Sequence, residues 1–104
     1  SGYLGAYKSG QWGYVNTSGE WQLPPIYFDI QPFEGNYAMA SKGHRKWGII
    51  DKSGKFVVPA RYDVIVQGDY YFMAILGYYK SFYTKTGELV WEGKYDKNWD
   101  KPKN

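Results

Sequence analysis

The sequence has no cysteine, a single histidine and no apolar run approaching the length of a membrane span. Without cysteine, the chain can form neither disulfides nor thiolate nucleophiles nor cysteine-ligated zinc sites. The one histidine, His44, lies between Lys42 and the pair Arg45-Lys46, whose positive charges would repel a metal cation. We therefore expect a soluble chain with no metal, no cofactor and no membrane span, and no histidine-based catalytic triad.

A glycosidase-like pair of carboxylates is the remaining route to catalysis. Glu20 and Glu88 follow equivalent turns, but the matching position between them in the chain is Lys55. A change of charge sign between equivalent positions indicates surface charge rather than a shared catalytic role. We predict that the protein is not an enzyme.

The chain has a small excess of positive charge and a high content of aromatic residues. Thirteen Lys and Arg against ten Asp and Glu give a net charge of +3, which is too low for a typical nucleic-acid-binding surface. Aromatic residues make up 21% of the chain, including twelve tyrosines and five tryptophans. Such a content fills a β core, covers a binding face, or does both.

The sequence repeats itself about three times. Residues 12–24 return as residues 47–59, and a weaker copy occupies residues 80–91. A unit of about 35 residues cannot bury its apolar face alone and must stack on its neighbours. We divide the single domain of residues 1–104 into a partial unit (3–11), repeat one (12–46), repeat two (47–79), a degenerate repeat three (80–96) and a tail (97–104).

Each repeat predicts a β-hairpin with a defined turn. In repeat two, a strand at 47–50 and a strand at 56–58 flank a turn in which Asp51 accepts backbone hydrogen bonds and Gly54 supplies a positive φ. Pro59 then ends the second strand. The equivalent turn residues in the other repeats are Asn16 with Gly19 and Thr84 with Gly87.

A third strand follows in each full repeat, at residues 37–41 and 71–75. We predict an all-β chain of tandem three-stranded antiparallel hairpin or meander repeats, with about nine short strands. The units form either a stacked array or a closed, barrel-like or propeller-like body, because the same alternation satisfies both.

Side-chain alternation assigns residues to faces. In the strand after each turn, one face carries six residues that we place in the core: Trp21, Leu23, Phe56, Val58, Leu89 and Trp91. Trp12-Gly13 and Trp47-Gly48 are replaced in repeat three by Lys80-Ser81, which we expect at a solvent-facing edge, as in the capping units of repeat proteins. The glycine beside each tryptophan allows a neighbouring strand to approach closely.

These motifs resemble the WG repeat family of bacterial proteins. Residues 46–59, followed by Tyr62 and Asp63, match the family pattern of Trp-Gly, an apolar pair, Asp-Lys-x-Gly, an apolar run, Pro and Tyr-Asp, and residues 11–27 fit it well. The resemblance implies an all-β tandem module, often in extracellular or cell-envelope settings, with no general catalytic activity and no catalytic residues to carry over.

Two features are candidate partner-binding sites. The first is the loop of Lys42, Gly43, His44, Arg45 and Lys46, which is either a solvated hairpin tip or a contact for an anionic surface, and which Lys8 and Lys80 would join if the units stack regularly. The second is a tyrosine cluster around residues 72–76, which is either buried or an exposed contact strip. Its members are Tyr70, Tyr71, Tyr78 and Tyr79.

Tyr62 and Tyr95 recur at the repeat period, each followed by an aspartate, which favours packing or a loop hydrogen bond over ligand contact. The leading hypothesis is a non-catalytic binding or spacer module for a protein partner. The alternative is carbohydrate or cell-wall binding through exposed Trp12, Trp47 or tyrosine rings. Nucleic-acid binding ranks third, because a charge of +3 supplies little phosphate attraction.

Overall fold

The structure of the protein is a computed structural model that describes residues 2–94, and every described regular element is a β-strand. The strands are β1 (Leu4–Lys8), β2 (Gln11–Val15), β3 (Trp21–Tyr27), β4 (Asp29–Ile30), β5 (Tyr37–Ser41), β6 (Trp47–Asp51), β7 (Phe56–Tyr62), β8 (Val64–Gln67), β9 (Tyr71–Leu76), β10 (Tyr79–Thr84) and β11 (Leu89–Lys94). The predicted all-β fold class is confirmed.

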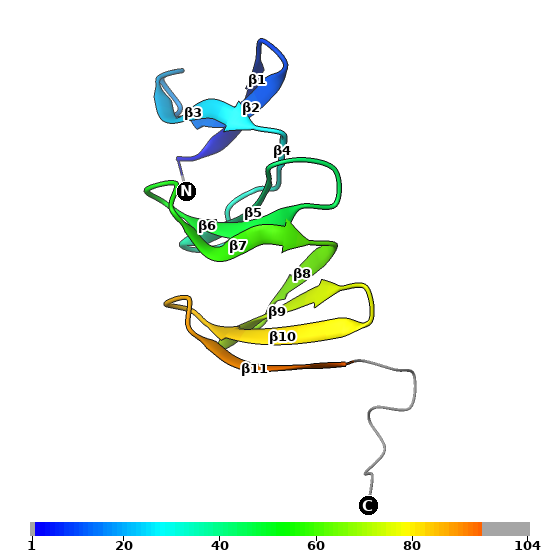
Figure 1. The fold of residues 1–104 in the computed structure, drawn as a ribbon. Coiled ribbons are helices and arrows are strands. Elements are labelled where there is room, and N and C mark those ends of the chain that lie inside the picture. Colours follow the sequence, from blue (N-terminus) through cyan, green and yellow to red (C-terminus); the bar gives the residue numbers. More distant parts are fainter. Residues whose placement is uncertain (1, 95–104) are drawn as a thin grey trace, which may run out of the picture.

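The strands form three antiparallel meanders that stack face to face (Figure 1). The first sheet is β1-β2-β3, the second is β4-β5-β6-β7 and the third is β8-β9-β10-β11. The described part of the chain is thus an open stack, not a closed body. The count of about nine strands omitted β4 and β8, which directly follow the recurring tyrosines; the β-branched run at 64–66 was the available signal for β8.

The three predicted turns form as expected. In the second sheet the N–H of Gly54 donates to the carbonyl of Asp51 at 2.9 Å, and the Asp51 carboxylate accepts from the N–H groups of Ser53 at 2.9 Å and Lys55 at 3.1 Å. The turn glycines have φ of 82°, 88° and 97° at Gly19, Gly54 and Gly87. The equivalent turns are therefore built alike, and each needs a glycine at this position.

The Trp-Gly glycine lies beneath a wide bulge. In the second sheet Trp47 pairs with Tyr62 and Ile49 with Val58, so residues 59–61 all lie opposite Gly48. A Cβ on Gly48 would come within 2.5 Å of the Val58 carbonyl oxygen. Only glycine leaves room for the bulged strand, and the first sheet repeats the arrangement at Gly13, whose Cβ would lie 2.6 Å from the Leu23 carbonyl oxygen.

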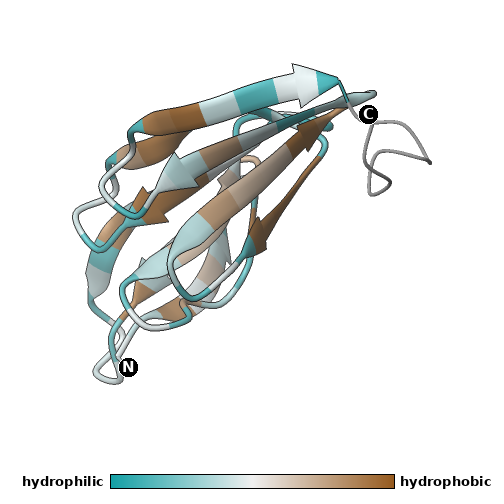
Figure 2. Ribbon diagram, turned by 90° about the horizontal axis from the view of Figure 1, so that it is seen from below, coloured by the Kyte–Doolittle hydropathy of each residue, from teal (hydrophilic) through white to brown (hydrophobic). Residues whose placement is uncertain are grey.

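Two cores hold the stack together, one at each junction between sheets. Between the first and second sheets lie Tyr14, Leu23, Tyr27, Ala38, Ala40 and Ile50. Between the second and third sheets lie Ile49, Val58, Tyr62, Ile65, Phe72, Ala74 and Tyr83. The second sheet is therefore apolar on both faces, and Figure 2 shows hydrophobic residues concentrated in the strands and hydrophilic ones in the connections.

The predicted assignment of side chains to faces is wrong at the bulges. Phe56 pairs with Ile50 and packs toward the first sheet, whereas Val58 pairs with Ile49 and packs toward the third. An extra residue, Val57, separates them, so strict alternation fails between Phe56 and Val58. The same irregularity separates Trp21 from Leu23.

Three of the six residues predicted in the core are exposed. Leu23 and Val58 are buried and Phe56 is half-buried, but Trp21, Leu89 and Trp91 are exposed, because they lie on outer faces or at the β11 edge of the stack. The prediction of a solvent-facing Lys80-Ser81 is also wrong: the two residues are 7% and 2% exposed. Both lie in β10, which has a partner strand on each side.

Candidate partner-binding surface

The connections between strands gather on two opposite sides of the stack (Figure 1). One side carries the Asx-type turns around Gly19, Gly54 and Gly87, which we call the turn side. The other side carries residues 9–10, 42–46 and 77–78, which we call the tip row. Successive sheets have the same orientation, so the tip row aligns loops that are far apart in the sequence.

The middle loop of the tip row carries the predicted basic residues. Lys42, His44, Arg45 and Lys46 are all exposed. The loop is ordered by its own backbone, because the Lys42 N–H donates to the Lys46 carbonyl and the Lys46 N–H to the Gly43 carbonyl, both at 3.1 Å. The Ser41 hydroxyl also donates to the Gly43 carbonyl at 2.5 Å. Because the loop backbone is already ordered, less backbone entropy is lost when the loop binds a partner.

Asp63 links this loop to the next one in the tip row. Its carboxylate lies 3.9 Å from the Arg45 Nε and accepts a hydrogen bond from the Gly77 N–H at 3.0 Å. The ion pair is largely solvated and contributes little to stability. Through these two contacts of Asp63, the basic loop lies next to the hairpin of Tyr78 and Tyr79, whose side chains are exposed.

The predicted tyrosine cluster does not exist as a single group. Tyr71 pairs with Thr84, whereas Tyr79 pairs with Leu76 at the other end of the same hairpin. Tyr70, 85% exposed, therefore lies on the turn side, away from Tyr78 and Tyr79. Between them, Phe72 and Ala74 are fully buried, so the middle of β9 is core.

The other lysines predicted in the tip row behave differently from each other. Lys8 is exposed beside the first loop of the row. Lys80 is buried in β10, so it is not part of the exposed basic surface.

Sequence reasoning missed two residues beside the basic loop, Arg61 and Phe28. Arg61 lies on the exposed bulge of β7, with its guanidinium carbon 5.3 Å from the centre of the Tyr62 ring, and Lys42 Nζ lies 5.2 Å from the ring centre of Phe56 on the same strand. Phe28, 55% exposed, donates its N–H to the Ser41 carbonyl at 2.9 Å, next to Lys42.

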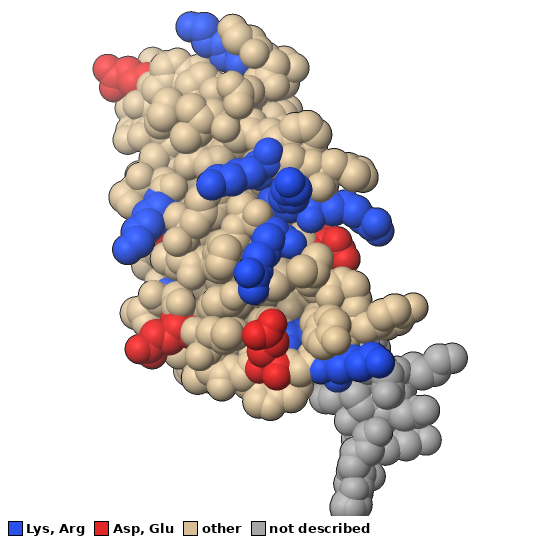
Figure 3. Space-filling model, viewed as in Figure 1, with Lys and Arg blue, Asp and Glu red and all other residues tan. Residues whose placement is uncertain are grey.

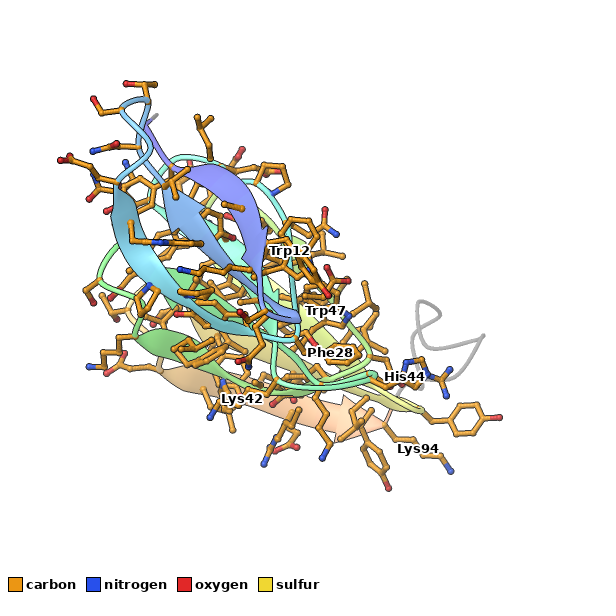
Figure 4. All side chains as sticks on the ribbon, turned by 90° about the horizontal axis from the view of Figure 1, so that it is seen from above. Trp12, Phe28, Lys42, His44, Trp47 and Lys94 are labelled. Atoms are coloured by element: carbon orange, nitrogen blue, oxygen red, sulfur yellow. The ribbon has the colours of Figure 1, made fainter. Side chains whose placement is uncertain are left out.

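Lys and Arg side chains gather around the middle of the stack (Figure 3). Figure 4 shows Phe28, Trp12 and Trp47 on one side of the stack, with His44 projecting beyond them.

The available sequence signal for Arg61 was its position in the repeat: it is equivalent to Ile26, and each of the two directly precedes a recurring tyrosine. Ile26 and Arg61 are both exposed, so this position lies on the outside of the bulge in both sheets.

The repeat tryptophans are half-buried rather than freely exposed. Trp47 packs against the core between the second and third sheets. The Trp12 ring meets Tyr7 edge-on at 5.1 Å and lines an open depression of about 300 Å³ with Tyr3, Tyr14 and Gln31. A second depression of about 340 Å³ shares Gln31 and is lined by Glu34, Met39 and Gln67.

The recurring tyrosines serve packing, as their period indicated. Tyr27 and Tyr62 are buried; the Tyr27 hydroxyl donates to the Gly54 carbonyl at 3.3 Å, and the Tyr62 hydroxyl bonds the Tyr83 hydroxyl. Burial, followed by the hydrogen bond with Tyr62, raises the pKa of Tyr83, and burial likewise raises the pKa of Tyr14 and Tyr27. Tyr95 lies outside the described residues.

Residues 2–94 hold neither a cluster of metal-ligating side chains nor a membrane-spanning helix. No three residues among the described histidines, aspartates and glutamates converge as metal ligands. The same part of the chain has no helix that is long and apolar enough to span a membrane.

The comparison with known families matches these structural features. The profile of the family described as WG containing repeat matches residues 12–43 and 47–71. The chain belongs to this family. The matched segments contain both Trp-Gly bulges, and they end before the Lys80-Ser81 unit, which has no such bulge. No curated protein matches the chain.

Proposed function

We propose that this WG repeat protein is a non-catalytic binding module that contacts an acidic protein surface through its tip row. The observation that carries the proposal is the ordered loop 42–46, which projects Lys42, His44, Arg45 and Lys46 beside Arg61 and, through Asp63, beside Tyr78 and Tyr79. Arginine and tyrosine are the residue types that most often anchor protein interfaces.

The stacked scaffold supports this proposal. Each tip loop joins two hydrogen-bonded strands, so its position is fixed by the sheet beneath it. A preformed surface loses little entropy when it binds, so more of the contact energy contributes to affinity. The positive charge of the loop would also speed encounter with an acidic partner at low salt.

The absence of catalysis is part of the proposal, and the positions of Glu20 and Glu88 support it. Glu20 and Glu88 belong to equivalent turns on the turn side, and the Glu20 carboxylate accepts a hydrogen bond from the Asn16 side-chain amide at 3.0 Å. Such a turn contact orders a loop. It does not place two carboxylates across a substrate.

A capture experiment with matched charge variants tests the proposal. The native chain, the variant K42A/R45A/K46A and the control variant K52A/K55A/K85A, which removes three charges from the turn side, are immobilised and exposed to the same lysate. We expect acidic proteins to be captured by the native chain and the control and lost from the tip-row variant. Equal capture by all three would remove the tip row as the site.

The Trp12 depression favours a second candidate, carbohydrate binding. Aromatic rings beside an amide group, here Trp12, Tyr3 and Tyr14 with Gln31, are suited to stacking on and hydrogen bonding to a sugar ring. Titration with soluble cell-wall oligosaccharides should then change tryptophan fluorescence in the native chain and in W21F, but not in W12F. Unchanged fluorescence in the native chain would eliminate this candidate.

A further inference from the structure

Among the described residues, each end of the stack is a largely apolar sheet face on which no further sheet packs. The outer face of the first sheet, which we call the leading face, carries Leu4, Ala6, Val15 and Trp21: Leu4 pairs with Val15, Val15 with Trp21 and Ala6 with Gly13, while the neighbouring Tyr14 points into the stack. Leu4 is 50% exposed and Trp21 39% exposed. No described residue stacks on this face.

The outer face of the third sheet is the trailing face. It carries Val64, Val66, Tyr71, Met73, Phe82 and Trp91, which share a face through the pairs Val66–Met73, Met73–Phe82 and Phe82–Trp91. The alternate residues Phe72 and Ala74 point the other way, into the core. Val66 and Trp91 are 47% and 52% exposed, so the described chain leaves this face in solvent.

The trailing face matches a face that is covered inside the molecule. Tyr71 and Met73 occupy the positions of Tyr37 and Met39, which pack against the core between the second and third sheets, and Phe82 occupies the position of Ile49. The two residue types Tyr and Met are identical at these equivalent positions. Lys80 stands on this face where the second sheet has Trp47, but at the Tyr, Met and Phe82 positions the third sheet presents outward the kinds of residue that the second sheet presents to its neighbour.

The leading face matches the opposite half of the same junction. Ala6 occupies the position of Ala40 and Ala74, which are fully buried where one sheet meets the preceding one. Val15 likewise occupies the position of the buried Ile50 and Tyr83. Within residues 2–94, no sheet packs on the leading face of the first sheet or on the trailing face of the third.

We propose that a second copy of this chain docks head to tail, with the trailing face of one copy packed on the leading face of the next. Both internal junctions pack a trailing-type face onto a leading-type face, and docking would extend this order across two molecules. The contact is heterologous, so a docked pair leaves one leading face and one trailing face free and the assembly can grow beyond a dimer. This inference concerns the ends of the stack and is independent of the tip row.

Two end-blocking variants test the direction of docking. L4K places a charge on the leading face and V66K on the trailing face; both residues are about half exposed, so each variant should fold. Sedimentation is measured from about 10 µM to about 1 mM, the range of weak protein association. We expect the mass-average molar mass of the native chain to rise with concentration. Each variant alone should remain monomeric.

Mixing the variants distinguishes head-to-tail docking from other modes. L4K keeps a working trailing face and V66K a working leading face, so an equimolar mixture should form dimers and nothing larger. The control F28K, altered in the connection between the first two sheets, should associate like the native chain. W21K and W91K repeat the test at independent positions on the same faces.

Three results would overturn the proposal. The native chain could remain monomeric throughout the concentration range. L4K alone could dimerise, which would indicate trailing faces meeting each other, or V66K alone could dimerise through leading faces. The mixture could also fail to associate although both variants retain the native far-UV circular dichroism spectrum.

Discussion

The equivalent strand pairs β6–β7 of the second sheet and β10–β11 of the third sheet are hydrogen-bonded in different registers. In the second sheet, Gly48 lies beneath the three-residue bulge of residues 59–61, which begins at Pro59. In the third sheet, Ser81 pairs directly with Glu92 and the ladder from Tyr79 to Phe82 has no bulge. Glycine and proline are thus lost together where the bulge is lost, which indicates that the Trp-Gly motif and its proline encode one backbone feature.

The largest expected effect comes from adding a Cβ at the bulge. G48A should destabilise the protein by about 3 kcal/mol, because the new carbon would lie 2.5 Å from the Val58 carbonyl oxygen and 2.9 Å from the Ala60 Cα. S81A puts the same residue at the equivalent position of the third sheet. It should change the free energy of unfolding by about 1 kcal/mol or less, because no bulge covers it.

Urea unfolding followed by circular dichroism measures both variants. A G48A variant as stable as S81A would show that the bulge does not require glycine. The change from Gly48 to Ser81 would then be a sequence difference that the bulge does not explain.

A smaller effect tests how the two junctions differ. At the first junction Ile50 lies where Tyr83 lies at the second, so the Tyr27 hydroxyl bonds the Gly54 carbonyl, whereas Tyr62 bonds Tyr83. Y62F and Y83F should each cost about 1 to 2 kcal/mol, since each leaves one buried hydroxyl without its partner. The double variant should cost less than the sum of the two, as a double-mutant cycle of urea unfolding would measure.

Strict additivity in that cycle would mean that the two hydroxyls are not coupled. Y27F is the matched control at the first junction. It should cost less than Y62F, because its 3.3 Å hydrogen bond is long.

The smallest effect compares the first two turns. Burial opposes the charge of Asp51, but hydrogen bonds from the Ser53 hydroxyl and from the Ser53 and Lys55 N–H groups outweigh it and hold the pKa of its carboxyl below the ordinary value. Asp51 therefore stabilises the fold above pH about 4, the pKa of an unfolded aspartate, and this contribution is lost as pH falls through the folded pKa.

D51N should remove this part of the loss of unfolding free energy at acid pH. The change should be less than about 1 kcal/mol, because the site is partly solvated. Asn16 already makes the corresponding bonds to Ser18 and Glu20 with an amide oxygen. Consequently N16D should add a similar acid dependence to the first turn. Stability measured from pH 7 to pH 3 that is identical in all three proteins would contradict this account.

The predictable features were local ones. Asn16, Asp51 and Gly54 define a turn through bonds spanning four residues or fewer, and that turn is present in the structure. The exposed loop 42–46 was also predicted from the residues between two strands. Adjacent residues were sufficient for both.

The features that were missed depend on partners far away in the chain. Phe56 and Val58 were assigned one face because the bulge that separates them is set by pairing with Ile49 and Ile50. Tyr70 and Tyr78 were grouped because they are close in sequence, but they lie at opposite ends of a six-residue strand. Lys80 reads as a surface residue, yet its strand lies inside the third sheet.

The sequence by itself determined the repeat, the all-β class, the turns and the membership of the WG repeat family, because each depends on residue types at short, fixed spacings. Only the tertiary structure decided which face each side chain takes, that the loop 42–46 adjoins Tyr78 through Asp63, and that no described residue stacks on the outer faces of the first and third sheets. The physical reason is that bulges and sheet stacking are set by contacts between residues far apart in the chain, and local propensity carries no information about them.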